Sequence, residues 1–103
     1  MQRLTYATAV VLQALARGFR YGFDIADATG LRGGTVYPIL RRLEKDGLIA
    51  SQWEAVAISR DEGRPPRKYY RLLSRSAAHV ALAETRFPFS PVMMDGVDAG
   101  VGG

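Results

Sequence analysis

One segment of the chain, from Gly33 to Gly47, carries side chains suited to contact with an anionic partner. Wound as an α-helix, the segment gathers these side chains on one side: Thr35, Pro38, Arg41, Arg42 and Lys45. Arginine and lysine groups of this kind bind phosphate oxygens and the edges of guanine bases. The chemistry indicated is therefore recognition of nucleic acid, with the DNA major groove as the leading hypothesis.

The opposite side of the same segment is apolar, and its residues are Val36, Ile39, Leu40 and Leu43. Their spacing of i, i+3, i+4 and i+7 is typical of a helix that packs one face into a core. We expect the helix to run from Gly34 to Asp46 and to close at Gly47. A start at Gly34 or Thr35 would leave Pro38 in the first turn, where a missing N–H costs little.

The residues that catalysis requires are scarce. The chain has one histidine, His79, and no cysteine, so no histidine-paired nucleophile and no thiolate or histidine-rich metal site is expected. Residues 30–35 lack the lysine and the spacing of a phosphate-binding loop. We therefore expect no enzymatic activity, no cofactor and no metal. We expect His79 to lie on the last helix, either at the surface or in the core of the protein.

Two helices, the second of them short, are expected before the basic segment. The first is expected from Thr5, as N-cap, to Gly18, and its apolar residues recur near helical spacing. The second spans 21–30, with Gly30 at the position that needs left-handed backbone. Because only a few residues separate it from the basic helix, the pair predicts a helix-turn-helix.

A β-hairpin is expected after the basic helix. Residues 48–53 are strand-like, residues 60–67 supply a polar turn with two prolines, and residues 68–72 read as the second strand. We expect Trp53, Tyr69 and Tyr70 to pack this hairpin, the wing, against the helices. A role for these rings in binding a drug-like ligand is the weaker alternative.

A last helix is expected to run to about Phe87, with Ser74 or Ser76 as its cap and Pro88 and Pro91 as its stop. The fold class is therefore α+β, mainly α: a winged helix-turn-helix with a two-stranded wing. We divide the chain into a DNA-binding domain (1–73), a C-terminal helix for dimerisation (74–87) and a flexible tail (88–103).

The net positive charge of the chain comes from its middle segment. The net charge is +4, and the stretch from Arg32 to Arg71, with nine basic and five acidic residues, accounts for all of it. Localised positive charge favours phosphate contact. The start of the chain lacks the layout of a signal peptide, and no apolar run approaches bilayer length, so we expect a cytoplasmic location and no membrane contact.

The sequence resembles the PadR family of bacterial transcriptional regulators. The resemblance covers roughly residues 4 to 87, and three stretches carry it: Tyr21-Gly22-Phe23-Asp24-Ile25, then Gly34-Thr35-Val36-Tyr37-Pro38 with Leu40-Arg41-Arg42-Leu43-Glu44 and Gly47-Leu48-Ile49, and lastly residues 63–72. It implies a homodimer that binds a near-palindromic operator and acts as a repressor. It also implies that a C-terminal helix forms the dimer. It further implies that a small hydrophobic or aromatic effector weakens DNA binding in some members of the family. The C-terminal helix expected here is shorter than the family pattern, and we assign no specific ligand.

Together these observations predict a set of DNA contacts in the recognition helix and the wing. The residues are Arg32, Gly34, Thr35, Tyr37, Pro38, Arg41, Arg42, Lys45, Arg64, Arg67 and Lys68. For the charged residues the alternative is an ordinary solvated surface, and for Tyr37 it is packing between helices. The alternative function is a winged-helix protein-interaction module that does not read DNA.

Overall fold

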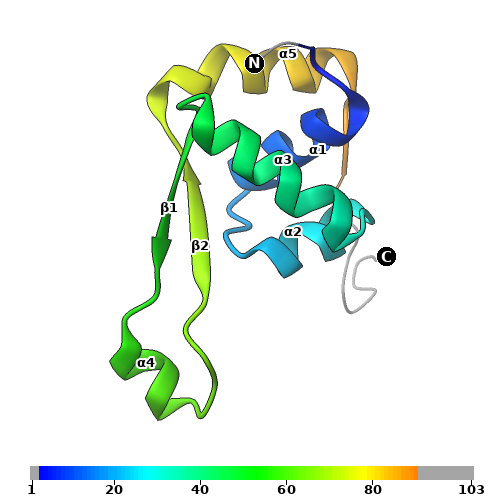
Figure 1. The fold of residues 1–103 in the computed structure, drawn as a ribbon. Helices are drawn as coiled ribbons and strands as arrows, with labels where there is room; N and C mark the ends of the chain where they lie inside the picture. The colour runs from blue at the N-terminus through cyan, green and yellow to red at the C-terminus, as the bar shows by residue number, and fades with distance from the viewer. Residues whose placement is uncertain (1–2, 91–103) are drawn as a thin grey trace.

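The computed structural model describes residues 3–90 of the chain, and Figure 1 shows the fold. The elements, in chain order, are α1 (Tyr6–Ala16), α2 (Gly22–Thr29), α3 (Gly33–Lys45), β1 (Ile49–Trp53), α4 (Val56–Asp61), β2 (Lys68–Leu72), the 3-10 helix η1 (Ser74–Ser76) and α5 (Ala77–Arg86). The predicted winged helix-turn-helix with a C-terminal helix is confirmed.

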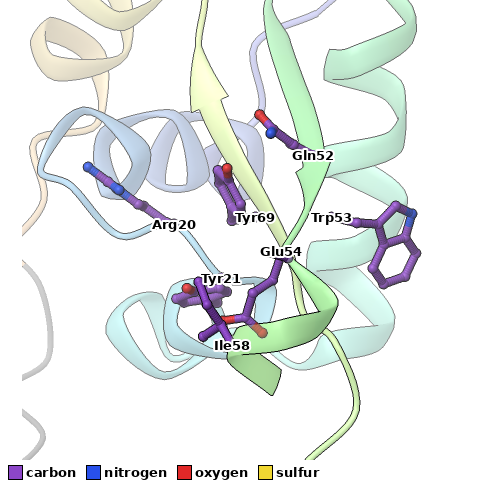
Figure 2. A pocket seen from close by; sticks show the side chains of 8 residues that line it. Arg20, Tyr21, Gln52, Trp53, Glu54, Ile58 and Tyr69 are labelled. Atoms are coloured by element: carbon purple, nitrogen blue, oxygen red, sulfur yellow. The ribbon is translucent and has the colours of Figure 1, made fainter. Parts of the chain in front are cut away.

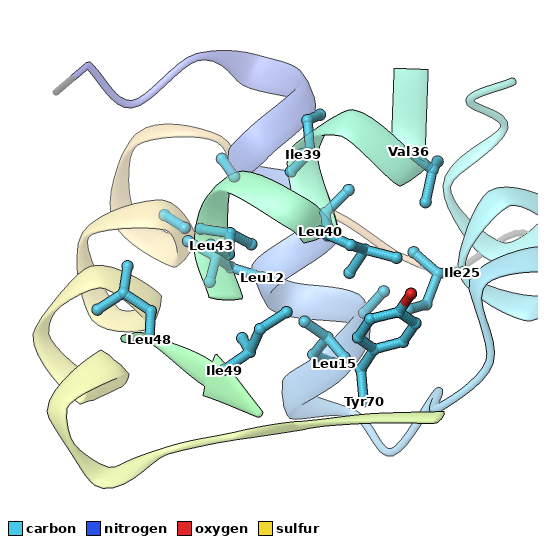
Figure 3. Packing of buried hydrophobic residues seen from close by; sticks show 14 residues of the cluster. Leu12, Leu15, Ile25, Val36, Ile39, Leu40, Leu43, Leu48, Ile49 and Tyr70 are labelled. Carbon is cyan, nitrogen blue, oxygen red and sulfur yellow. The ribbon is translucent and has the colours of Figure 1, made fainter. Parts of the chain in front are cut away.

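Helix α1 lies at the centre of the molecule. It contacts α2, α3, β2 and α5, which explains why the run from Thr8 to Leu15 is buried on every side. The helix begins as expected, because the Thr5 hydroxyl oxygen accepts a hydrogen bond from the Thr8 N–H at 3.2 Å. The apolar stripe of α3 packs onto this core, as Figure 3 shows.

The turn between α2 and α3 has the predicted form. Gly30 ends α2 in left-handed backbone (φ 76°), and its N–H donates to the Ala26 carbonyl oxygen at 2.9 Å. After Leu31 and Arg32 the chain enters α3 at Gly33. The two helices are therefore joined by the tight, glycine-containing connection of a helix-turn-helix.

The expected place of Pro38 in the first helical turn is wrong. Helix α3 begins at Gly33, so Pro38 lies five residues beyond its start, inside the helix. Proline has no N–H to donate to the carbonyl oxygen of Gly34. Both residues are exposed, so water can reach that oxygen and reduce the cost of the lost bond.

Strands β1 and β2 pair antiparallel, with Ile49 opposite Leu72 and Trp53 opposite Lys68. The hairpin is also tied to the helical body, because the Tyr70 N–H donates to the Arg20 carbonyl oxygen at 2.9 Å. The segment between the strands differs from the expected open turn, since it contains helix α4. Figure 1 shows α4 at the tip of the wing, beyond the layer of helices.

The expected packing of the wing aromatics holds for two residues and is wrong for one. Tyr70 is buried in the core, and Tyr69 contacts the ring of Tyr21. Trp53 instead remains 63% exposed. Burial along β1 falls toward Trp53, because the strand diverges from α3 along its length.

Helix α5 returns the chain to α1. Ser76 stands at its N-cap as expected, yet its hydroxyl donates to the Leu73 carbonyl oxygen at 2.6 Å and makes no capping bond to the helix. Helix α5 ends before Pro88, in agreement with the sequence.

The segment after α5 is held against α1 as far as it is described. The Arg17 guanidinium donates to the Phe89 carbonyl oxygen at 2.7 Å, and Phe89 packs against the core. Residues 88–90, the first of the predicted flexible tail, are thus bound to the body of the protein. The rest of that predicted tail, including Pro91, lies outside the described residues.

Candidate nucleic-acid interface

The two faces of α3 are separated in the structure as the sequence predicted. Val36, Ile39, Leu40 and Leu43 are buried, and the predicted contact residues of this helix and its N-cap are all exposed. The exposed set is Arg32, Gly34, Thr35, Tyr37, Pro38, Arg41, Arg42 and Lys45. The core therefore holds α3 by one side and leaves its polar and basic side free for a partner.

The first turn of α3 is open at its N-terminal end. Arg32 is the N-cap, and its side chain makes no capping hydrogen bond to the helix. Beyond its chain neighbours and the adjacent backbone of the helix, a Cβ built on Gly34 would meet no atom within 4 Å. The Thr35 and Val36 N–H groups donate to the Arg32 carbonyl oxygen, whereas those of Gly33 and Gly34 lack helical acceptors, and such groups suit a phosphate.

Tyr37 has a packing role that the sequence left open. Its ring lies against the backbone of Gly22, where a Cβ would overlap the ring, although the side chain as a whole is 42% exposed. The alternative of packing between helices is therefore correct for one side of the ring. The exposed side stays available to a partner.

Of the predicted wing cations, Arg64 is already engaged within the protein. Its two terminal nitrogens donate to the two carboxylate oxygens of Glu54, at 2.6 and 2.8 Å, and its Nε donates to Glu62 at 2.9 Å. The hydrogen bonds from Arg64 hold the pKa of the Glu54 carboxyl below its ordinary value. Because only 19% of the Arg64 side chain is exposed, its evident role is to fold the wing segment around Glu54.

Glu54 also borders a hollow on the wing. The volume of this hollow is about 340 Å³, and Figure 2 shows Arg20, Tyr69 and Ile58 around the hollow. Trp53 also borders this hollow, although Figure 2 shows its ring directed toward the side of β1 on which α3 lies.

Arg67 and Lys68 contact aromatic rings on the side where Trp53 lies. The Arg67 guanidinium carbon is 5.3 and 5.1 Å from the ring centroids of Tyr21 and Phe23, and the Lys68 ammonium is 5.8 Å from that of Trp53. These five residues line an open cleft of about 420 Å³, which also includes Tyr37. We call this the aromatic cleft.

The aromatic cleft brings two predicted sets of residues together. Tyr37 belongs to the recognition helix, and Arg67 and Lys68 belong to the wing. Sequence reasoning missed Tyr21 and Phe23 as members of this surface and predicted that Trp53 would pack the wing against the helices. The available signal was the Tyr21-Gly22-Phe23 stretch. A glycine between two aromatic residues at the start of a helix suggests that another side chain packs closely against the glycine backbone.

The described part of the chain offers little for other classes of site. Within residues 3–90, no helix is both long enough and apolar enough to cross a bilayer, and no group of three acidic, histidine or cysteine side chains is placed to hold a metal ion. His79 is half-buried on α5.

Comparisons with known proteins agree with this geometry. The sequence profile of the transcriptional regulator PadR-like family matches residues 11–76. No curated protein matches the chain.

Several solved structures are similar to this one. A PadR family transcription regulator from hypervirulent Clostridium difficile R20291 is 26% identical, with a TM-score of 0.66 over 79% of this chain and 85% of that one. A PadR family transcriptional regulator from Eggerthella lenta DSM 2243 is 27% identical, with a TM-score of 0.58 over 79% and 73%. Pex from Synechococcus sp. (strain PCC 7942) is 28% identical, with a TM-score of 0.56 over 80% and 81%.

Proposed function

We propose a specific mode of action from one premise: this chain belongs to the PadR-like family, whose members are DNA-binding transcriptional regulators and not enzymes. In this proposal α3 enters the major groove and the wing binds the flanking backbone. Residues 1–73 bind DNA, residues 74–87 join two protomers, and the dimer represses transcription from a near-palindromic operator in the cytoplasm.

One observation carries the DNA-binding surface. Tyr37 of α3 and Arg67 and Lys68 of the wing line the same open cleft, so the recognition helix and the wing present one continuous surface. Arg41 and Arg42 extend that surface along α3, and both are exposed. Arg64 takes a structural part in it, since Glu54 occupies its guanidinium.

The proposed dimer uses the outer side of α5. Leu82 is exposed there, and Tyr6 of α1 is exposed while its ring packs edge-on against Phe87 at 6.0 Å. Exposed apolar side chains on a terminal helix are suited to a self-complementary contact. A two-fold dimer would place the two α3 helices in major grooves about one helical turn apart.

The experiment that tests DNA binding is a gel-shift titration with promoter DNA selected from the genome. Arg41→Ala combined with Arg42→Ala should weaken binding by about 100-fold while the circular dichroism spectrum stays the same. The control is Arg3→Ala with Arg20→Ala, which removes two exposed charges outside α3, the wing and the proposed dimer segment and should have little effect. Equal affinity of the two double variants would overturn the assignment of α3.

A small hydrophobic or aromatic effector completes the proposal. An apolar hollow of about 370 Å³, lined by Leu72, Leu73 and Val80 among others, lies between η1 and α5. Because the hollow adjoins the proposed dimer helix, a molecule bound there would change how the two recognition helices are spaced. A screen of small aromatic compounds for release of bound DNA tests this part.

The alternative function is a protein-interaction module, and the exposed apolar side chains of α4 favour it. Val56 is 56% exposed and Ile58 is 49% exposed, both at the tip of the wing. A competition experiment distinguishes the two functions. If the partner occupies a DNA-binding surface, random genomic DNA should displace the partner from the protein. No displacement, together with no shift of promoter DNA, would favour the protein-interaction module.

A further inference from the structure

The aromatic cleft has a composition that the proposed phosphate contacts do not by themselves require. Three ring-bearing residues, Phe23, Tyr37 and Trp53, are exposed at or beside it, although exposed aromatic rings gain nothing from water. Two cations, Arg67 and Lys68, lie on these walls. A partner that fits must therefore offer both an apolar face and negative charge.

The rings hold Arg67 in a fixed position. Tyr21 and Phe23 are stacked on each other, with centroids 6.2 Å apart and planes inclined by 19°. The guanidinium lies within 5.3 Å of both centroids, where the face of a ring attracts a cation. A planar guanidinium ordered in this way loses less entropy when it binds an anion.

The positive charge of Arg67 is left available by its neighbours. The carboxylate of Glu54 accepts a hydrogen bond from the Arg67 backbone N–H at 3.3 Å. Its oxygens are taken by the bidentate contact with Arg64. Within residues 3–90 neither Arg67 nor Lys68 forms an ion pair, so both charges can act on an external anion.

The position of the cleft identifies the anion. Its mouth includes Tyr37, which lies on the exposed side of α3 with Arg41 one turn further along the helix. In the proposed docking, a duplex lying along α3 would carry its backbone past this cleft. Phosphate and sugar receive half to two-thirds of the hydrogen bonds that proteins make to DNA.

We infer that the aromatic cleft is a subsite for one deoxyribose phosphate of the DNA backbone. Arg67 and Lys68 bind the phosphate, and Phe23 and Trp53 pack against the apolar face of the sugar. Tyr21 and Phe23 also act as positioning residues, because they hold the Arg67 guanidinium. The inference rests on the proposed function and adds to it a place, a ligand group and three residues.

The only tryptophan of the chain provides a direct measurement. Trp53 is 63% exposed in the free protein, so a sugar packed on its ring should change its fluorescence emission. Titration of the full chain with promoter DNA should shift or quench the emission at the same concentrations that shift the gel. Emission that stays constant while the gel shows complete binding would overturn the inference and leave the proposed function intact.

A double-mutant cycle tests the positioning role. Arg67→Ala should weaken DNA binding roughly tenfold and lower the slope of log Kd against log salt by about one, as the loss of one phosphate contact predicts. Phe23→Leu should weaken binding in the wild-type background and much less in the Arg67→Ala background, because its effect passes largely through Arg67. Equal effects of Phe23→Leu in both backgrounds would overturn the positioning role.

Two controls complete the cycle. Arg60→Ala removes an exposed charge from the same wing, and its effect should simply add to that of Phe23→Leu. The second control is 2-naphthoate, a small aromatic anion without a backbone. If it saturates the Trp53 signal and DNA does not, the cleft is a small-molecule site and the inference fails. If the wild-type chain shifts no DNA in the gel, the proposed function itself fails.

Discussion

The ring of Tyr37 on α3 lies directly on the backbone of Gly22 at the start of α2. A Cβ at position 22 would overlap the ring, so the two helices can approach this closely only because residue 22 is glycine. The same ring borders the aromatic cleft with its exposed side. The contact therefore sets both the packing of the helix-turn-helix and the position of a residue on the proposed DNA surface.

Gly22→Ala should disturb both properties. The added methyl group must displace Tyr37, and overpacking of this kind costs about 1–3 kcal/mol of unfolding free energy. DNA affinity should fall at the same time, because the Tyr37 ring moves toward the cleft. Thermal unfolding and a gel-shift titration measure the two effects.

Removal of the ring supplies the control for this prediction. In the Tyr37→Ala background the three atoms closest to the methyl group, all from the Tyr37 ring, are removed, so Gly22→Ala should then cost far less stability. An equal loss of stability in both backgrounds would show that the helix contact does not explain the need for glycine at position 22.

The features of this fold that are local in sequence could be predicted. The buried stripe of α3 follows from a spacing that is visible within eight residues, and the left-handed end of α2 follows from Gly30 alone. The strand Lys68–Leu72 has the predicted bounds, because alternation in a half-buried strand is also a local pattern.

The features that were missed depend on partners distant in sequence. The buried residue of helix α4 is Ser59, so no apolar stripe in the sequence predicts this helix. The segment is closed by the hydrogen bond from Arg64 to Glu54, two residues that are distant in sequence. The pairing of Gly22 with Tyr37 joins two helices and leaves no mark in either one. The exposure of Trp53 depends on how the wing is placed relative to the helices, which composition does not tell.

The stability of the wing should depend on pH through Glu54. The Arg64 hydrogen bonds lower the pKa of the Glu54 carboxyl from its ordinary 4.5, so the folded state favours the ionised group. The resulting stabilisation is fully present above pH 4.5 and is lost as the pH falls through the lowered pKa of the folded protein. Glu54→Gln should therefore be less stable than wild type at pH 7, and the difference should shrink with acidification.

Thermal unfolding at pH 7 and at pH 3 checks this prediction. Glu62→Gln is the matched control, because Glu62 contacts the same arginine at 2.9 Å while its side chain is 57% exposed. Solvent weakens such an exposed pair, so Glu62→Gln should have a small effect at either pH. A Glu54→Gln variant whose deficit is the same at both pH values would contradict the proposed linkage.

Gln13 should be the polar residue on which the docking of α5 depends most. Its amide nitrogen is buried on α1 and donates to the carbonyl oxygens of Ala83 and Phe87, at 3.3 and 2.8 Å. Gln13→Met keeps the approximate volume and removes these donors, and it should cost about 1–3 kcal/mol. The same substitution at the exposed Gln52 is the control and should stay near zero by chemical denaturation. Similar losses at the two positions would show that the buried amide has no special role.

Gly34→Ala should separate stability from DNA binding. Gly34 is exposed in the first turn of α3, and a Cβ there meets no atom within 4 Å beyond its chain neighbours and the adjacent helix backbone. Alanine should therefore raise the unfolding free energy, by up to about 1 kcal/mol, because it is the better helix former. Yet DNA affinity should fall roughly tenfold, since a methyl group on the outer side keeps a phosphate from the backbone N–H groups.

Gly33→Ala is the matched control for this separation. Its Cβ would face inward, at an ordinary contact distance of 3.5 Å from the Tyr37 ring. The helix should gain stability in a similar way, while the outer side of the turn keeps its shape and its DNA affinity. Thermal unfolding and gel-shift titration of the two variants, side by side, decide the matter. If Gly34→Ala binds DNA as tightly as Gly33→Ala, no backbone phosphate approaches the start of α3, and the proposed docking of this helix must be revised.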